Sequence, residues 1–389
     1  MTLSRKVKNL LLLLTLSFVV LCFYNYQYNK DYRISFKEKY SVDGAPNLDK
    51  SIKLGGFSGL FYDKTDNQGN VYLWAITDRG PNSNKFKKNT KTFRVFPIQK
   101  FKPKIVYLKL TTGKKVEIIN VSDVSELSGI PISAKRDSTP VTKNHNNLPF
   151  DINGADTEGL VKDKVGNFWI VDEYYPSIIK LDKDLKILKR FAPKDSKVFN
   201  KSITYNLPSI FNKIKKNNGF ESIDYDNKER IYIFIQSNLK KGLNIKVLVF
   251  NIKSENVEKV YDYHPDKKSI VSDIVFIKNG LFLSLEKTDE NHIISKIIIP
   301  DQQESGNIYG KKIISLQKDN SFITSEFKME GIAYDGENKI FIINDNDFGI
   351  DDKNTKESFL LEYKLEGCSL IFPKGLIASL SYWIKKILK

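Results

Sequence analysis

Acidic side chains recur at both ends of short apolar stretches in this 389-residue sequence. Glu158 precedes one such stretch, and Asp172 and Glu173 directly follow it. Carboxylates in this arrangement can bind a divalent cation, and they can also act as general acids or bases. The chain is rich in lysine and carries a net charge of +16, so these repeated acids stand out against its composition.

A similar pattern of residues occurs in four stretches, which begin near residues 57, 157, 220 and 329. Each has a small or acidic start, an apolar pair, a turn with Asp, Gly or Asn, and an apolar strand with a polar end. The position before the apolar pair holds Glu158, Glu221 and Glu330. The position after the strand holds Asp78, Asp172, Glu173, Glu286, Asp345, Asn346 and Asp347.

The elements that carry these acids are short strands, rich in Ile, Val, Phe and Tyr and bounded by turn residues. Aligned on Gly59, Gly159, Ser222, Ile274 and Gly331, the repeat has intervals of 100, 63, 52 and 57 residues. An interval of roughly 50 to 60 residues suits one four-stranded propeller blade, and an interval twice as long suits two. The sequence therefore predicts an all-β fold, a single β-propeller of six or seven blades.

Equivalent ends of successive blades converge on one opening in a propeller, so these acids are expected to meet there. Clustered carboxylates repel one another, and a cation would offset them. Ca²⁺ is the cofactor that such oxygen ligands favour. The predicted metal ligands are Glu158, Asp172, Glu173, Glu221, Glu286, Glu330, Asp345 and Asp347.

A bound Ca²⁺ would hold and polarise a small phosphorylated substrate while a carboxylate acts as the base. The predicted catalytic residues are Glu158, Glu221, Glu330 and Arg79, and the predicted substrate-binding residues are Asp78, Arg79, Lys287 and Asn346. Two alternatives remain open. Arg79, Lys287 and Arg230 are protein cations that could balance the acids instead, and Asp345 to Asp347 could simply shape a turn.

The two ends of the chain differ from the strand-rich part. Arg5, Lys6 and Lys8 precede an apolar stretch at residues 10–24, which predicts export by a signal peptide or an uncleaved membrane anchor. The expected organisation is a signal or anchor at 1–30, a juxtamembrane linker at 31–53, the propeller at 54–365 and a C-terminal amphipathic helix at 366–389. That helix could pack on the propeller or lie on a membrane. The expected location is periplasmic or at the cell surface, as a monomer.

Several functions are excluded by the sequence. The lysines are scattered and no ribonucleoprotein motif is present, so we expect no nucleic-acid partner. A Cys/His zinc site is excluded because only Cys368 remains after the predicted leader. Ser58 lacks the glycine spacing of a nucleophile elbow, and neither a P-loop nor a dinucleotide-binding fingerprint occurs.

Five ordered motifs between residues 55 and 361 resemble the esterase-like phytase family. They are FSGLFYD with YLWAITDRGP, DTEGLVKDKVGNFWIVDEYYPSIIKLD, NNGFESIDYD, DIVFIKNGLFLSLEK and MEGIAYDGENKIFIINDNDFG. The resemblance implies an exported bacterial propeller that hydrolyses phosphoesters, with its acids at the positions named above. Lys287 stands where arginine is more usual, Ser222 replaces a common glycine, and the SGL opening lacks an acid.

Three hypotheses follow. The first is an exported, Ca²⁺-assisted phosphoester hydrolase. The second is a lactonase-like propeller hydrolase with one Ca²⁺ bound by Glu, Asn and Asp. The third is a non-catalytic propeller that binds an envelope partner through its loops.

Overall fold

The computed structural model describes residues 32–83, 86–112, 115–134, 139–196, 203–236, 244–300, 306–350 and 356–367. The chain divides into two units, Ser35–Lys364 and a smaller one made of Met1–Ile34 with Leu365–Lys389. The predicted signal or anchor and nearly all of the predicted C-terminal helix lie outside the described residues. Within the described ranges, no helix combines the length and the apolar character needed to cross a membrane.

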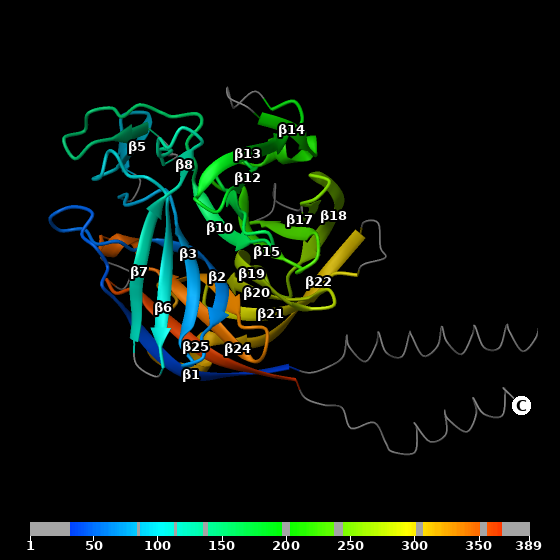
Figure 1. Cartoon of the computed structure of the whole chain (residues 1–389). Helices are drawn as coiled ribbons and strands as arrows, with labels where there is room; N and C mark the ends of the chain where they lie inside the picture. The colour runs from blue at the N-terminus through cyan, green and yellow to red at the C-terminus, as the bar shows by residue number, and fades with distance from the viewer. Residues whose placement is uncertain are drawn as a thin grey trace, which may run out of the picture. The chain divides into compact units, whose positions relative to one another are not determined.

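The described strands form five four-stranded units (Figure 1). The first is β2 (Phe57–Thr65), β3 (Val71–Thr77), β6 (Lys104–Thr111) and β7 (Lys115–Asp123). The second is β10 (Thr157–Lys162), β11 (Phe168–Asp172), β12 (Ser177–Leu181) and β13 (Lys186–Pro193). The third is β15 (Phe220–Tyr225), β16 (Arg230–Ile235), β17 (Ile245–Asn251) and β18 (Asn256–His264). The fourth is β19 (Ile270–Lys278), β20 (Leu281–Lys287), β21 (His292–Ile298) and β22 (Gly306–Ser315). The fifth is β23 (Lys328–Tyr334), β24 (Lys339–Asp345), β25 (Phe359–Gly367) and β1 (Tyr32–Asp43).

The innermost strands of these units close a ring. Strand β2 contacts β10, β10 contacts β15, β15 contacts β19, β19 contacts β23, and β23 contacts β2. The described strands therefore form a β-propeller of five units rather than the predicted six or seven. The interval of 100 residues between Gly59 and Gly159 misled the prediction, because it holds one unit and two insertions instead of two blades.

Strand β1 corrects a second expectation. Residues 31–53 were predicted to be a linker, but β1 is the outermost strand of the fifth unit and lies next to β25. Tyr40 on β1 donates a hydrogen bond to Glu362 Oε2 on β25 at 2.9 Å. Strand β1 also pairs in parallel with β7 of the first unit. The N-terminal strand thus joins the first and last units of the ring.

The two insertions of the first half pair with each other. Strands β4 (Phe86–Lys88) and β5 (Lys91–Val95) lie in one insertion and β9 (Thr139–Val141) in the other, and together they form a three-stranded sheet. The remaining elements are short. They are β8 (Ser125–Glu126) and β14 (Ile203–Leu207), which pair with β13, and the single turns η1 (Ser209–Lys213), α2 (Leu316–Asp319) and η2 (Asp347–Gly349).

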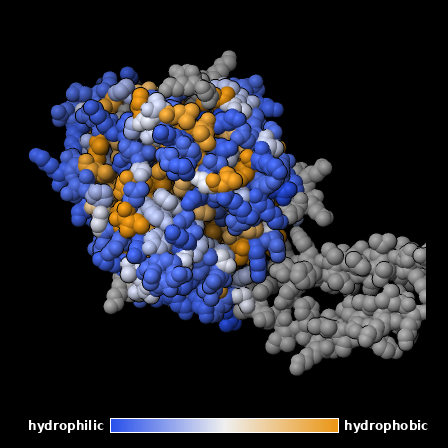
Figure 2. Space-filling view, viewed as in Figure 1, coloured by the Kyte–Doolittle hydropathy of each residue, from blue (hydrophilic) through white to orange (hydrophobic). Residues whose placement is uncertain are grey.

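The strands form where they do because their apolar residues are buried between neighbouring sheets. Every residue of β11 is buried, and so are five of the six residues of β16. Continuous apolar runs of β-branched and aromatic residues suit strands that are covered on both faces. Outside this core, Figure 2 shows hydrophobic residues among hydrophilic ones on the visible face.

Glycine sets how closely the innermost strands approach. A Cβ atom on Gly59 would lie 2.5 Å from the carbonyl oxygen of Glu158, and one on Gly159 would lie 3.0 Å from the backbone nitrogen of Ile223. A Cβ atom on Gly331 would lie 2.9 Å from the carbonyl carbon of Gly59. Neighbouring units therefore meet backbone to backbone at this level, which places the residues just before these glycines close together.

Candidate functional site

The strand register places two equivalent side chains of every unit at one end of the ring. The innermost strand of each unit has a register shift that is consistent with a β-bulge, and such a bulge re-aims the side chain within it. The residues at this shift are Ser58, Glu158, Glu221, Ser272 and Glu330. In the second strand of each unit, one residue pairs with the innermost-strand residue just before the shift. The residue that follows it in the chain is the second side chain at this end of the ring. These second residues are Asp78, Glu173, Gln236, Lys287 and Asp345.

This register also corrects the alignment of the fourth unit. Asp273 pairs with Leu285 just after the bulge, as Gly331 pairs with Ile343. Asp273, rather than Ile274, is therefore equivalent to the repeat glycines. Its Oδ2 accepts a hydrogen bond from the backbone nitrogen of Ile332 in the fifth unit at 2.9 Å.

The carboxylates of different units act on one another electrostatically, so the site is shared. Burial raises the pKa of Glu158 well above its usual range, and the charges of Glu221, Asp156, Glu173 and Asp78 raise it further. These residues come from the first three units of the ring. Their mutual repulsion in a buried place means that the ionised cluster is costly without a cation.

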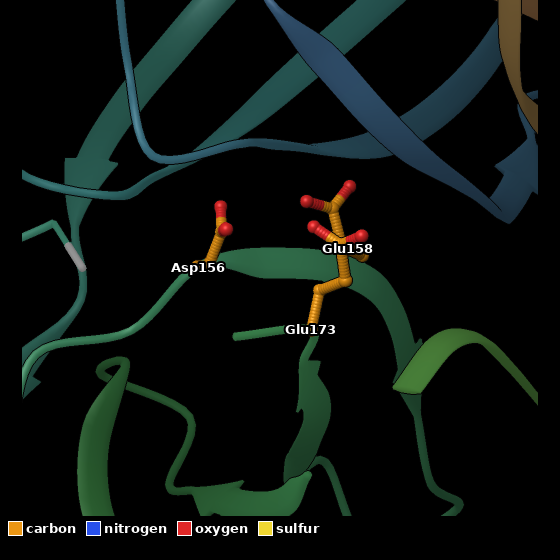
Figure 3. A group of neighbouring side chains, drawn as sticks. All are labelled: Asp156, Glu158 and Glu173. Carbon is orange, nitrogen blue, oxygen red and sulfur yellow. The ribbon is translucent and has the colours of Figure 1, made fainter. Parts of the chain in front are cut away.

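Three of these acids lie close enough to hold one ion. One carboxylate oxygen from each of Asp156, Glu158 and Glu173 lies within 4.8 Å of the others, and all three residues are buried. Figure 3 shows their carboxylates grouped beside β10. Burial, followed by the charge of Asp156, raises the pKa of Glu173 to about 8 even though Arg79 opposes the shift.

Arg79 is the cation that pairs with this three-acid group. Its Nη1 lies 2.8 Å from Asp156 Oδ2, and its Nη2 lies 3.7 Å from Glu173 Oε2. Nη1 also donates a hydrogen bond to Asn217 Oδ1, and Asn217 Nδ2 donates to Glu173 Oε1 at 3.3 Å. Arg79 therefore lies against the acids instead of pointing into solvent, with only 10% of its side chain exposed.

Glu221 retains an unused carboxylate oxygen. Glu221 Oε1 accepts a hydrogen bond from Gln236 at 3.1 Å, whereas Oε2 is buried and has no hydrogen-bond partner in the described part of the chain. Glu158 is 8% exposed. A buried carboxylate oxygen without a donor is destabilising unless a cation or water lies against it. The chemistry of this donor set fits a hard divalent cation such as Ca²⁺.

A second group of charges lies in the fifth unit. Lys328 Nζ lies 3.2 Å from Asp345 Oδ2 and also pairs with Asp347. Asp347 is therefore occupied by a lysine in this structure. Burial raises the pKa of Glu330 to about 7, and the charge of Asp345 adds to the shift while Lys328 opposes it.

Two of the predicted metal ligands, Asp172 and Glu286, lie outside the acidic group. Asp172 Oδ1 accepts hydrogen bonds from the backbone nitrogens of Asp156 and Tyr174 at 3.3 and 3.0 Å. Glu286 accepts hydroxyl hydrogen bonds from Tyr263, Ser284 and Ser269 at 2.5 to 2.6 Å. Successive side chains of a strand point to opposite faces. Asp172 and Glu286 therefore point to the face opposite to that of Glu173 and Lys287.

Asn346 holds the backbone beside the site. Its Oδ1 accepts hydrogen bonds from the backbone nitrogens of Gly56 and Phe348, both at 3.1 Å, and its Nδ2 donates to the carbonyl of Lys356 at 3.1 Å. A Cβ atom on Gly56 would lie 2.1 Å from the Phe348 ring, so this turn requires glycine. In the structure, Asn346 thus joins the first unit to the fifth.

The comparisons with known proteins concern the whole of this ring. The family described as "Phytase-like: Esterase-like activity of phytase" matches residues 52–348. The chain belongs to the phytase-like family. No curated protein matches the chain.

Several solved structures resemble this phytase-like chain with little sequence identity. The PQQ-bound aldose sugar dehydrogenase of Streptomyces coelicolor is 8% identical, with a TM-score of 0.38, over 87% of this chain and 99% of that one. A luciferin-regenerating enzyme is 9% identical, with a TM-score of 0.40, over 85% and 97%. A protein assigned as a gluconolactonase is 9% identical, with a TM-score of 0.36, over 81% and 92%.

Asp156 is the site residue of this phytase-like propeller that the sequence prediction missed. It stands two residues before Glu158 in the motif DTEG. Residues two apart in an extended strand point to the same face, so this spacing was a usable signal. The repeat pattern does not mark Asp156, because the other repeats have no acid at the equivalent place.

Proposed function

We propose that this phytase-like propeller is an exported phosphoester hydrolase and that Ca²⁺ bound at the acidic site assists it. The charge imbalance of the buried site carries the proposal. Its carboxylates are Asp78, Asp156, Glu158, Glu173, Glu221, Glu330 and Asp345. Arg79 and Lys328 are ion-paired with members of this set. Lys287 also acts electrostatically on Glu330, and since three monovalent cations cannot neutralise seven carboxylates, a divalent cation would stabilise the site.

Asp156, Glu158 and Glu173 would hold the ion, and Glu221 has a further unused oxygen. When bound, Ca²⁺ would neutralise and polarise a phosphate group and acidify a bound water. Glu330 suits proton transfer, because a pKa of about 7 lets it both accept and donate near neutral pH. Lys287 takes the equivalent position in the fourth unit and gives the opening an anion-binding group.

Charge-neutral replacement of one acid tests the proposal. Glu158→Gln should weaken Ca²⁺ binding at least about tenfold. Replacing a group that only supports a metal ligand typically costs that much, and this change removes the charge of a ligand itself. Calorimetric titration of Ca²⁺ into purified protein measures this, and chelator should abolish hydrolysis of a phosphoester panel by the unmodified chain.

Glu286→Gln is the matched control, because Glu286 is also buried but bound by hydroxyl groups outside the acidic site. It should leave Ca²⁺ affinity unchanged. Absence of Ca²⁺ binding by the unmodified chain would overturn the metal assignment. Ca²⁺-dependent cleavage of lactones but not of phosphoesters would replace the proposed reaction with the lactonase alternative.

A further inference from the structure

Arg79 lies where it competes with the cation that the three-acid group would bind. It lies against Asp156 and Glu173, which are two of the three ligands proposed above. Arginine is always protonated, and a divalent ion a few ångströms from a guanidinium group would be repelled by it. We propose that Arg79 is a built-in counter-ion that Ca²⁺ displaces from these carboxylates, and that the displaced guanidinium then binds the substrate anion. This inference rests on the proposed function.

The surroundings of Arg79 restrict the movement to its side chain. The next residue, Gly80, has φ +91°, and a Cβ atom there would lie 2.2 Å from the Phe101 ring. Gly80 N also donates a hydrogen bond to Asp78 Oδ1 at 2.7 Å. The backbone is therefore fixed at both sides of Arg79, while its long side chain has several rotatable bonds. Displacement by an ion requires a change of rotamer and no change of fold.

Asn217 joins the guanidinium to the acids. It accepts a hydrogen bond from Arg79 and donates one to Glu173, and its own backbone has φ +62°. Displacing Arg79 leaves the Asn217 contact to Glu173 in place. Asn217 can therefore keep Glu173 oriented in both arrangements of the arginine.

Charge balance favours the exchange. Arg79 pairs with Asp156 and Glu173, while Glu158 is a third buried carboxylate in the same group. One positive charge thus leaves the cluster under-neutralised. A divalent ion brings two charges to the same oxygens, and the released arginine regains a partner when a phosphate binds in its fork-shaped, bidentate geometry.

The exchange links the two ligands thermodynamically. If Ca²⁺ frees Arg79 for the anion, Ca²⁺ must tighten anion binding, and the anion must tighten Ca²⁺ binding by the same factor. Coupling between sites typically amounts to about 5- to 150-fold. This reciprocity can be measured on the unmodified chain by titrating inorganic phosphate with and without Ca²⁺, and Ca²⁺ with and without phosphate.

Arg79→Met gives the sharper test, because it removes the competitor and keeps an unbranched apolar side chain. We expect Ca²⁺ to bind this variant about fivefold more tightly or better, while phosphate binding in the presence of Ca²⁺ weakens at least tenfold. Unfolding in the presence of chelator should begin at a lower temperature than in the unmodified chain. Arg79→Lys keeps the charge without the fork-shaped guanidinium group. Its affinities for Ca²⁺ and phosphate should lie between those of the unmodified chain and those of Arg79→Met.

Lys328→Met is the matched control, because Lys328 pairs with Asp345 and Asp347 outside the three-acid group. It should change Ca²⁺ affinity much less than Arg79→Met does. Unchanged or weaker Ca²⁺ binding by Arg79→Met, beside normal binding by the unmodified chain, would overturn this inference alone. Absence of Ca²⁺ binding by the unmodified chain would overturn the proposed function as well. If Arg79→Met does not fold, an absence of reciprocal coupling in the unmodified chain overturns the inference.

Discussion

At the scale of single residues, one step along a strand separates a site residue from a supporting one. Glu173 belongs to the three-acid group, whereas Asp172 beside it accepts backbone hydrogen bonds from Asp156 and Tyr174. Arg190 approaches Asp172 Oδ2 at 3.9 Å and donates to the carbonyl of Asn153 at 3.1 Å. Asp172 and Arg190 therefore fix the backbone on which Asp156 lies, as second-shell groups do at metal sites.

Asp172→Asn should accordingly weaken Ca²⁺ binding by about 10-fold although Asp172 is not a ligand, since supporting carboxylates typically contribute that much. Glu286→Gln changes the equivalent register position of the fourth unit and should lower only the unfolding temperature. Calorimetric titration and thermal unfolding of both variants separate the two effects. Equal losses of Ca²⁺ affinity in the two variants would show that Asp172 acts only through general stability.

At the scale of elements, an aspartate at the first hairpin of four units fixes the turn. Asp66, Asp163, Asp226 and Asp335 each accept backbone hydrogen bonds from residues two and four positions later. Asp side chains stabilise turns in this way. These acids are as regular in the sequence as those of the site, but they lie at the opposite end of the innermost strand and serve the fold.

Asp163→Ala should lower the free energy of unfolding by about 2 kcal/mol, because Trp169 Nε1, which donates to Asp163 at 2.9 Å, would be left buried without a partner. Asp66→Ala should cost less, since the corresponding donor is the Tyr72 hydroxyl, which can turn toward solvent. Urea unfolding measures both. Weaker Ca²⁺ binding by a folded Asp163→Ala protein would contradict a purely structural role.

At the scale of the whole molecule, buried acids also join neighbouring units of the ring. Asp224 on β15 accepts a hydrogen bond from the backbone nitrogen of Phe276 on β19. Burial raises the pKa of Asp224 from its ordinary 3.8 to about 7. Burial outweighs the hydrogen bond from Phe276, which favours the ionised carboxylate, so the folded state is most favourable when Asp224 is protonated.

The sign of the pH dependence follows from this shift. A carboxyl group whose pKa is raised by folding contributes stability below pH 3.8, and that contribution is lost as the pH rises through about 7. Asp224→Asn stays neutral and retains an acceptor for Phe276. The free energy of unfolding of this variant, relative to the unmodified chain, should thus increase between pH 4 and pH 7 and then level off. Urea unfolding at several pH values tests this, and parallel pH profiles would contradict it.

The sequence by itself determined the class of fold and the places of the repeated acids. Short apolar strands between turn residues predict an all-β ring of repeats, and Glu158, Glu221 and Glu330 mark one position in that repeat. These signals are local, because they depend on strand periodicity and turn preference. The family assignment agrees with them.

Only the tertiary structure decided the number of units, the place of β1 and the membership of the site. Ring closure depends on contacts between strands far apart in the chain, which spacing alone does not encode. Whether Asp156 or Asp172 faces the other acids depends on the bulge and register of β10 and β11, and a shift of one residue reverses the face. That Arg79 neutralises two of the acids follows only from the folding of the first and second units against each other.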